Sequence, residues 1–393
     1  MDLAFLHPLY EHQGPWASVY VDTPPHTEDA PHERHLAAVA VARELSAQGA
    51  DEDTCVAVRE ALEDLRHSSE PHGRAVFARA GKVVLDPPLT RSPESGVVRW
   101  APLPHTAPLL ELAGEDPVCV VAYVDRKGAD FELRGALGRR DAGSVTGKQW
   151  PVHADRAAHG SEHARLSPTA RKAWGDPQRH FQLRVENTWE HNAAEIADAL
   201  AVCQEETGAD LLILVGEERE KRSVRERLPK RLHDLVVEAE HGAGSRLLDE
   251  DVERARTGHA RQRAERELER FLAARAPGDD GRPGAVEGVP ALVEAAREHR
   301  IDELLIRPDG PDAHREVWIG EDPDQLAVRR TELKILGEQN SWSARADDAL
   351  IRSAVATGAP ALSVTPAAGA AGAAGASGEE VPVGGLGALL RWA

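Results

Sequence analysis

The amino-acid sequence predicts a mixed α/β (α+β) protein with three domains. Its 393 residues can form two or three domains, each large enough for its own core. Apolar runs alternate with segments of helical periodicity, which is typical of sheets covered by helices. Two stretches rich in proline or glycine, 87–108 and 276–284, separate the alternating parts. The predicted domains therefore span 1–110, 117–278 and 285–393.

The composition is that of a globular protein with a strong acidic excess, because the net charge is −19. No run of eighteen apolar residues occurs, which argues against a membrane span. The first residues lack a basic segment followed by an apolar one, so we expect no secretory signal. The three cysteines, Cys55, Cys119 and Cys203, are far apart in apolar surroundings. We expect buried free thiols in a cytoplasmic protein.

The first predicted domain combines a hairpin with helices. Apolar residues at helical spacing predict helices at 33–48 and 51–66, and apolar runs predict strands at 15–22, 75–80 and 82–85. A short helix is expected in 1–14. Asp51 or Asp53 is a plausible N-cap of the second long helix. Six prolines between 87 and 108 exclude most regular structure there, so this stretch is the expected path to the next domain.

The middle domain is predicted from two apolar runs. Val118–Val124 contains four valines and Leu211–Val215 is wholly apolar, so both are expected to be buried strands of one sheet. The other predicted elements are a strand at 129–137, a helix at 185–206, a helix at 217–227, a strand at 235–238 and a charged helix at 247–275.

The last domain is predicted to be a small α/β unit. Its expected elements are helices at 288–299 and 345–357, and strands at 303–307, 316–319, 361–365 and 384–392. The Ala/Gly stretch 367–378 is of low complexity and is predicted to be a loop.

The long segment between the strands of the middle domain has a charge opposite to that of the whole chain. From Arg139 to Arg184, the basic insert, there are nine basic and four acidic residues, a difference of +5. Such a loop in so acidic a protein suggests a polyanionic partner at this place. The alternative is an ordinary solvated loop with a high arginine content.

Motifs for phosphate loops, metals and nucleophiles are incomplete in the basic insert. Gly147-Lys148 resembles a phosphate loop, but Ala142 and Gln149 stand where that motif needs glycine and serine or threonine. The spacing of His153, His159 and His163 matches no standard metal site. No Gly-x-Ser-x-Gly turn occurs. We therefore expect neither a metal nor a cofactor.

Several short motifs, in their order along the chain, resemble the archaeal and eukaryotic release factors, their relative Pelota and, more closely, the bacterial release-factor-like (baeRF) proteins. The motifs are Gly14-Pro-Trp-Ala-Ser-Val-Tyr-Val-Asp22, Val124-Asp-Arg-Lys-Gly-Ala-Asp130, Trp150-Pro-Val-His153, Asn187-Thr-Trp-Glu-His-Asn-Ala-Ala-Glu-Ile196, Leu214-Val-Gly-Glu-Glu218, Ala346-Asp-Asp-Ala-Leu350 and the terminal Gly384–Trp392. The resemblance covers essentially the whole chain.

This resemblance implies a fold and partners. The middle domain would be ribonuclease-H-like, with an insert that enters the peptidyl-transferase centre of the ribosome. The C-terminal domain would have the ribosomal-protein L7Ae fold, which docks on a translational GTPase. The chain also resembles Balon, a Pelota-like hibernation factor that occupies the ribosomal A site with elongation factor Tu. That GTPase, or another, is therefore an implied partner.

The resemblance also implies where hydrolytic function would lie, and the sequence departs from it there. Release factors carry Gly-Gly-Gln at the tip of the insert, where it positions a water on the peptidyl-tRNA ester. This sequence has no Gly-Gly-Gln; Gly160-Ser161-Glu162 occupies the loop and Gly147-Lys148-Gln149 precedes it. A carboxylate at the tip would be repelled by phosphates, which favours a Pelota-like function without hydrolysis.

The expected function is thus that of a ribosome-binding translation factor in hibernation, stress or rescue, which contacts the RNA of both subunits at the A site. The residues expected to bind RNA are Arg139, Arg140, Lys148, Gln149, His153, Arg156, His159, His163, Arg165, Arg171 and Lys172. One alternative is a peptidyl-tRNA hydrolase, in which Gln149 or a histidine of the insert orients water. The other is an interaction protein with no RNA partner.

Overall fold

The computed structural model describes residues 1–22, 30–64, 73–113, 117–125, 128–135, 138–140, 189–242, 244–278, 281–335, 337–338, 340–364 and 382–392. These residues form two compact units, one of Met1–Glu115 with Arg263–Ala393 and one of Asp116–Gln262. Both units contain sheets and helices, so the predicted α/β class is confirmed. Within the described part of the chain, no helix has the length and apolarity needed to cross a bilayer.

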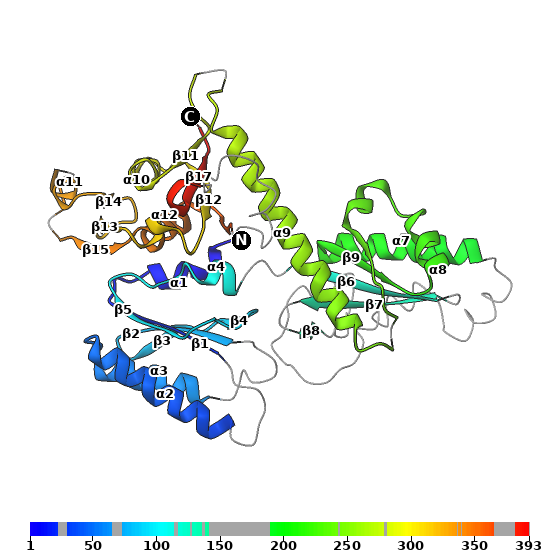
Figure 1. Cartoon of the computed structure of the whole chain (residues 1–393), viewed down its shortest axis with the longest axis horizontal. Coiled ribbons are helices and arrows are strands. Elements are labelled where there is room, and N and C mark those ends of the chain that lie inside the picture. The colour runs from blue at the N-terminus through cyan, green and yellow to red at the C-terminus, as the bar shows by residue number, and fades with distance from the viewer. Residues whose placement is uncertain are drawn as a thin grey trace. The chain divides into compact units, whose positions relative to one another are not determined.

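The N-terminal sheet of the first unit has the strand order β3-β2-β1-β5 and is antiparallel, with β4 paired to β2. Strand β1 alternates: Trp16 and Tyr20 face one core, and Ala17 and Val19 face another. Helices α2 and α3 cover the second of these faces (Figure 1). The bounds are β1 Trp16–Asp22, β2 Gly73–Arg79, β3 Lys82–Leu85, β4 Pro88–Leu89, β5 Val97–Ala101, η1 Ala4–Leu6, α1 His7–Tyr10, α2 Ala30–Ala47, α3 Glu52–Glu63 and α4 Leu109–Leu112.

One predicted cap is confirmed and one predicted irregular stretch is wrong in part. Asp51 is the N-cap of α3, and its Oδ1 accepts the backbone N–H of Thr54 at 2.8 Å. The proline-rich stretch 87–108 contains strand β5, which pairs with β1. No proline lies between Pro93 and Pro102, so the intervening N–H groups are free to join the sheet.

The C-terminal part of the first unit contains a four-stranded sheet, β11-β17-β12-β16, and a three-stranded one, β14-β13-β15. Leu304 and Ile306 of β12 face helices α10 and α12, whereas Leu305 faces helix α9. The bounds are α9 Leu248–Ala274, β11 Ala285–Glu287, α10 Val289–Arg297, β12 Ile301–Ile306, η4 Pro311–His314, β13 Glu316–Ile319, β14 Leu326–Ala327, α11 Arg330–Ile335, β15 Trp342–Arg345, α12 Ala346–Thr357, β16 Ala361–Ser363, η6 Val383–Gly385 and β17 Leu386–Leu390.

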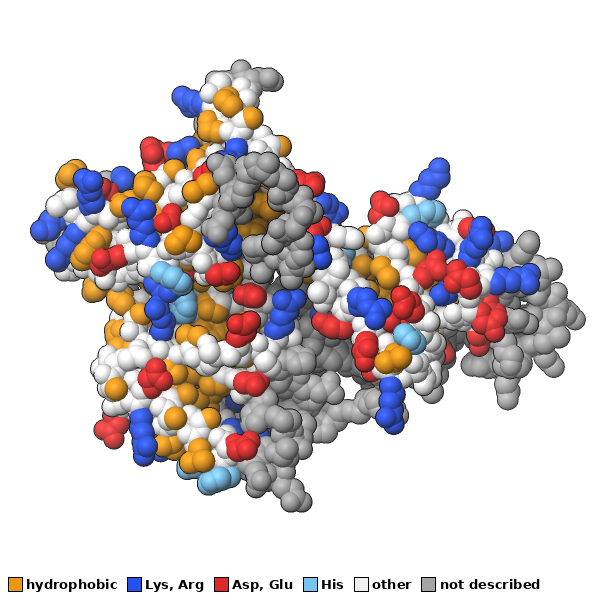
Figure 2. Space-filling view, in the orientation of Figure 1, with side chains coloured by type: hydrophobic (Ala, Val, Ile, Leu, Met, Phe, Trp, Pro, Cys, Tyr) orange, Lys and Arg blue, Asp and Glu red, His pale blue; other side chains and the backbone are white. Residues whose placement is uncertain are grey.

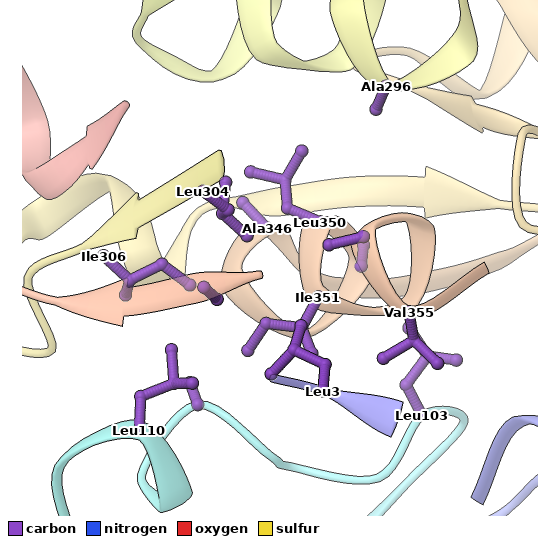
Figure 3. Close-up of a cluster of buried hydrophobic side chains, with 14 of the residues drawn as sticks. Leu3, Leu103, Leu110, Ala296, Leu304, Ile306, Ala346, Leu350, Ile351 and Val355 are labelled. Atoms are coloured by element: carbon purple, nitrogen blue, oxygen red, sulfur yellow. The ribbon is translucent and has the colours of Figure 1, made fainter. Parts of the chain in front are cut away.

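The N-terminal and C-terminal parts of the first unit share one hydrophobic core. Leu3, Leu103 and Leu110 pack with Leu350 and Ile351 of α12 in a single buried cluster (Figure 3). These two parts are the predicted first and third domains, and they form one unit by their contacts. The division of the chain into three domains stays a prediction.

The middle unit is a mixed sheet of strand order β10-β9-β6-β7-β8. Strands β6 and β9 pair in parallel, Val121 lying opposite Ile213, so the prediction that the two apolar runs share a sheet is confirmed. Strand β7 pairs with β6 in the antiparallel sense, and the short strand β8, which was not predicted, extends the sheet beyond β7. The bounds are β6 Cys119–Asp125, β7 Gly128–Gly135, β8 Gly138–Arg140, α7 Trp189–Thr207, β9 Leu211–Val215, α8 Glu218–Arg225, η3 Lys230–Leu235 and β10 Val236–Glu238.

Both faces of the middle sheet are covered, as the unbroken apolar runs predict. Val120 and Ala122 lie in a core with α7, whereas Cys119 and Val121 lie in a second core with Leu248 and Val252 of α9. The three cysteines, Cys55, Cys119 and Cys203, are free and buried, as expected.

Candidate nucleic-acid interface

Strand β8 contains the first two residues of the basic insert, and helix α7 begins five residues after the end of the insert. Of the residues predicted to bind RNA, Arg139 and Arg140 lie in β8, opposite Arg134 and Leu133 of β7 in the register. The other nine lie outside the described residues: Lys148, Gln149, His153, Arg156, His159, His163, Arg165, Arg171 and Lys172. The structure therefore describes the elements at the two ends of the insert, and RNA binding by the insert remains a prediction from the sequence.

A buried ionic network fixes the strand next to β8. Arg134 of β7 donates through Nη1 to Asp249 Oδ1 at 2.6 Å and through Nη2 to Tyr123 Oη at 2.7 Å. Its Nη2 also lies 3.1 Å from Glu132 Oε2, and Tyr123 donates to the same carboxylate at 2.6 Å. Burial and the hydrogen bond to Glu132 raise the pKa of Tyr123 to about 12. The network joins β6, β7 and the first turn of α9.

The sequence pattern explains why these polar groups face α9. Phe131 and Leu133 of β7 pack with α7, so the alternating residues Glu132 and Arg134 are on the opposite face of the strand. The side chains of Glu132 and Arg134 are 0% and 6% exposed. Charges buried to this degree need partners, and here each is both paired and hydrogen-bonded.

A second polar cluster lies at the start of α9. Asp251 accepts the backbone N–H groups of Glu240 and His241 at 2.9 and 2.8 Å, and His241 Nδ1 lies 3.0 Å from the same oxygen. Burial acts to raise the pKa of Asp251, but these hydrogen bonds outweigh it and lower the pKa. Glu240, His241 and Asp251 are close enough to share a cation. The oxygens of Asp251 are already engaged, including by Arg254 at 3.0 Å, so the cluster fits a structural role.

A third cluster lies in the first unit and joins residues far apart in the sequence. Asp348 at the start of α12 accepts from His105 Nδ1 at 2.9 Å and from the backbone N–H of Thr106 at 3.0 Å. The neighbouring Asp347 accepts from Arg345 Nε at 3.0 Å. Burial and the adjacent Asp348 raise the pKa of Asp347 to about 6, and Arg345 opposes that shift.

His105, Asp347 and Asp348 also have the proximity of metal ligands. Arg345 supplies the cation here, since its guanidinium contacts both carboxylates. The Asp-Asp pair stands in one of the motifs that carry the family resemblance, but no local pattern connects it with His105, 243 positions away. The arrangement ties the segment after β5 to α12 and offers no open position for a substrate.

The described surface of the middle unit is of mixed charge. In Figure 2, Lys and Arg side chains are interspersed with Asp and Glu over the face that carries α8 and α9. Exposed ion pairs such as Arg222 with Glu226 and Arg225 with Glu238 account for part of this pattern. Within the residues that the structure describes, the middle unit thus shows no basic patch that could replace the insert as an RNA-binding surface on this face.

Comparison with known protein families gives a match for the middle of the chain. Residues 118–277 match the model of the Bacterial archaeo-eukaryotic release factor family 2. The matched segment runs from β6 to the end of α9 and includes the basic insert. The resemblance to the baeRF proteins that the sequence motifs indicate is thereby confirmed.

Whole-length relatives and solved structures extend the comparison. An uncharacterized protein of Mycobacterium tuberculosis, found in two strains, is 27% identical over 394 residues, 97% of this chain and 94% of the relative. Pelota of Archaeoglobus fulgidus is similar at 15% identity and a TM-score of 0.33, covering 82% of this chain and 79% of that one. The archaeal translation termination factor aRF1 is 16% identical with a TM-score of 0.22, covering 99% and 96%.

Proposed function

From the family match over the unit that carries the basic insert, we propose that this protein is a ribosome-binding translation factor of the release-factor-like type. It acts in the cytoplasm in hibernation, stress or rescue by occupying the A site of the ribosome. The observation that carries the proposal is the coincidence of that match with the insert, whose charge of +5 contrasts with −19 for the chain.

The insert contacts ribosomal RNA chiefly through phosphates. Arginine presents a planar fork of donors that suits phosphate oxygens, and seven of the nine basic residues of the insert are arginines. Such contacts give affinity and orientation without reading base sequence. A protein with this chemistry recognises a folded RNA surface by its shape and charge, as an A-site factor must.

The proposed activity is binding without hydrolysis of peptidyl-tRNA. The positioning of a catalytic water is sensitive to about 1 Å, and the insert lacks the Gly-Gly-Gln that performs this task in release factors. Codon-independent release of labelled peptide from ribosomes, abolished by Gln149→Ala, would contradict this part of the proposal. It would favour the second candidate function, a peptidyl-tRNA hydrolase.

Delivery by a GTPase is a separate part of the proposal. The family resemblance implies elongation factor Tu or another translational GTPase as the partner. Pull-down of purified elongation factor Tu by the immobilised protein, with GTP and with GDP, tests it directly. If equal amounts of elongation factor Tu are recovered on the immobilised protein and on blank resin, elongation factor Tu is not a partner.

Ribosome binding is tested with vacant 70S ribosomes across a salt series. Each phosphate contact releases counterions, so log K falls with log salt by roughly 0.7–0.9 per contact. If Arg156, Arg165, Arg171 and Lys172 each reach a phosphate, changing all four to Ala flattens the slope by about 3 and weakens binding strongly at physiological salt.

A matched control has the same charge change on the described surface of the middle unit. It replaces Arg219, Arg222, Lys230 and Arg231, which are all exposed, by Ala. We expect this variant to retain the salt slope of the wild type. Equal binding and equal slopes for the wild type and the insert variant would contradict the proposal, and equal losses in the two variants would show that only net charge matters.

A further inference from the structure

Three carboxyl groups surround one guanidinium where the C-terminal half of α9 packs on the C-terminal sheet. Arg270 of α9 lies 3.2 Å from Glu267 Oε2, 3.2 Å from Asp302 Oδ2 and 3.8 Å from Glu303 Oε2. The side chains of Asp302 and Glu267 are 43% and 24% exposed, and that of Glu303 is only 8% exposed. The most buried carboxyl group is therefore the one farthest from the guanidinium.

The position of Glu303 follows from the strand that bears it. Leu305 of β12 faces α9 and packs in a core with Leu268 and Phe271, and Glu303 lies two residues earlier on the same side of the strand. Its strand partner is Leu389 of β17, which belongs to the same core. A carboxylate in such surroundings loses hydration, and the guanidinium of Arg270, 3.8 Å away, is shared with two other carboxyl groups, so the neutral acid is favoured.

The charged groups that face Glu303 come from three segments. Helix α9 contributes Glu267 and Arg270, and β12 contributes Asp302. The amino group of Met1, hydrogen-bonded to the Ala361 carbonyl at 2.8 Å, is a second cation that acts on Glu303. The neighbouring strands β16 and β17 contain no charged residues.

Burial and the facing carboxyl of Glu267 dominate over the two cations. Together they raise the pKa of Glu303 to about 7. Glu267 Oε2 and Glu303 Oε2 lie 3.2 and 3.8 Å from the same nitrogen, Arg270 Nη1, so the two carboxyl groups are neighbours and can hydrogen-bond to each other when one of them carries a proton. When both are ionised, two negative charges face each other across the contact between helix and sheet.

We propose that Glu267 and Glu303 form a pH-sensitive carboxyl pair that fastens the C-terminal half of α9 to the C-terminal sheet. With one shared proton the two side chains hydrogen-bond and the helix packs through Leu268 and Phe271. Loss of that proton to solvent replaces the hydrogen bond by repulsion, and this half of α9 opens more often. The inference concerns contacts within the first unit and does not depend on the proposed function.

Amide hydrogen exchange of the full chain tests the carboxyl pair. Exchange in 264–274, corrected for the intrinsic pH dependence, reports local opening of α9. Between pH 6 and pH 8 we expect the equilibrium constant for opening in the wild type to increase about tenfold. This increase follows because the pKa of Glu303 is about 7 in the packed state and returns to its usual lower value in the open state.

The variant Glu303→Gln retains the hydrogen bond without the proton, so its opening should be independent of pH. Asp302→Asn is the matched control on the same guanidinium and should keep the tenfold change. Glu267→Gln, at a more exposed position, provides a second variant that should clearly reduce the pH dependence, because only the burial of Glu303 then raises its pKa, and this test holds even if Glu303→Gln fails to fold. The proposal would be overturned if opening of the wild type did not depend on pH. It would also be overturned if the tenfold change persisted in the Gln variants that fold, or if it were lost in Asp302→Asn.

Discussion

Two of the buried polar clusters, those of Arg134 and Asp348, differ in how far along the chain they reach. In the middle unit, Arg134 joins Tyr123 of the neighbouring strand β6, eleven positions away, and Glu132 of its own strand, two positions away. It also contacts Asp249. In the first unit, Asp348 joins His105 and Thr106 across more than 240 positions. The first cluster reinforces a hairpin that backbone pairing already forms, whereas the second closes the core shared by the two ends of the chain.

The difference also lies in what would remain after one partner is lost. Removal of the Asp348 carboxylate leaves buried backbone N–H groups and a buried imidazole, which have little access to water. Removal of the Arg134 guanidinium leaves Glu132, whose carboxylate keeps the hydroxyl of Tyr123 as a partner. We therefore expect the long-range cluster to matter more for stability than the local one.

The largest effect is expected for Asp348→Ala. It leaves several buried donors without their acceptor, and we expect the free energy of unfolding of the first unit to fall by about 3–5 kcal/mol. Denaturant titration measures the change. Asp348→Asn keeps an acceptor for Thr106 N–H and should lose clearly less. Equal, small losses in both variants would show that the cluster is dispensable.

The next effect is expected for Arg134→Met, which keeps the stem and removes the charge. The buried carboxylate of Glu132 then lacks this cation, which should cost about 3 kcal/mol, and the loss should decrease at low pH as that carboxylate becomes protonated. The double variant Glu132→Gln with Arg134→Met should recover part of the stability. If Arg134→Met is as stable as the wild type at pH 7, the network does not contribute to the stability of the folded state.

The pH dependence of the first unit distinguishes the two clusters further. Because the pKa of Asp347 is raised from its usual value to about 6, the folded state binds more protons than the unfolded state between about pH 4 and pH 6. Its contribution to stability is therefore highest below that window and decreases, by at most about 3 kcal/mol, as the pH rises through it. Asp347→Asn should flatten the stability profile between pH 4 and pH 6, and an unchanged profile would contradict the assignment.

The smallest effect is expected for Asp249→Ala in the middle unit. Asp249 is 62% exposed, so its ion pair with Arg134 is screened by solvent and should contribute within about 1 kcal/mol. A double-mutant cycle with Arg134→Met measures the coupling. Coupling above about 2 kcal/mol would mean that α9 contributes as much to the network as the strands do.

The elements that could be predicted from sequence are those whose signals are local. Asp51 stands directly before a helical pattern, and its capping of α3 needs only residues up to Thr54. The runs Val118–Val124 and Leu211–Val215 are apolar at every position, which requires a strand covered on both faces. Strand β5 was not predicted, because the prolines around it dominate the local composition, although the segment Val97–Ala101 itself contains no proline.

The sequence by itself determined the α/β class, the presence of the two central strands in one sheet, the charge of the basic insert and the family resemblance. The tertiary structure alone decided that His105 meets Asp348, that Glu303 faces Glu267, and that the two ends of the chain share a core. Periodicity and helix caps depend on residues that are close together in the chain, so the sequence is enough to predict them. Buried charge partners depend on the path of the chain, because two segments far apart in sequence meet only when the sheets and helices between them have packed.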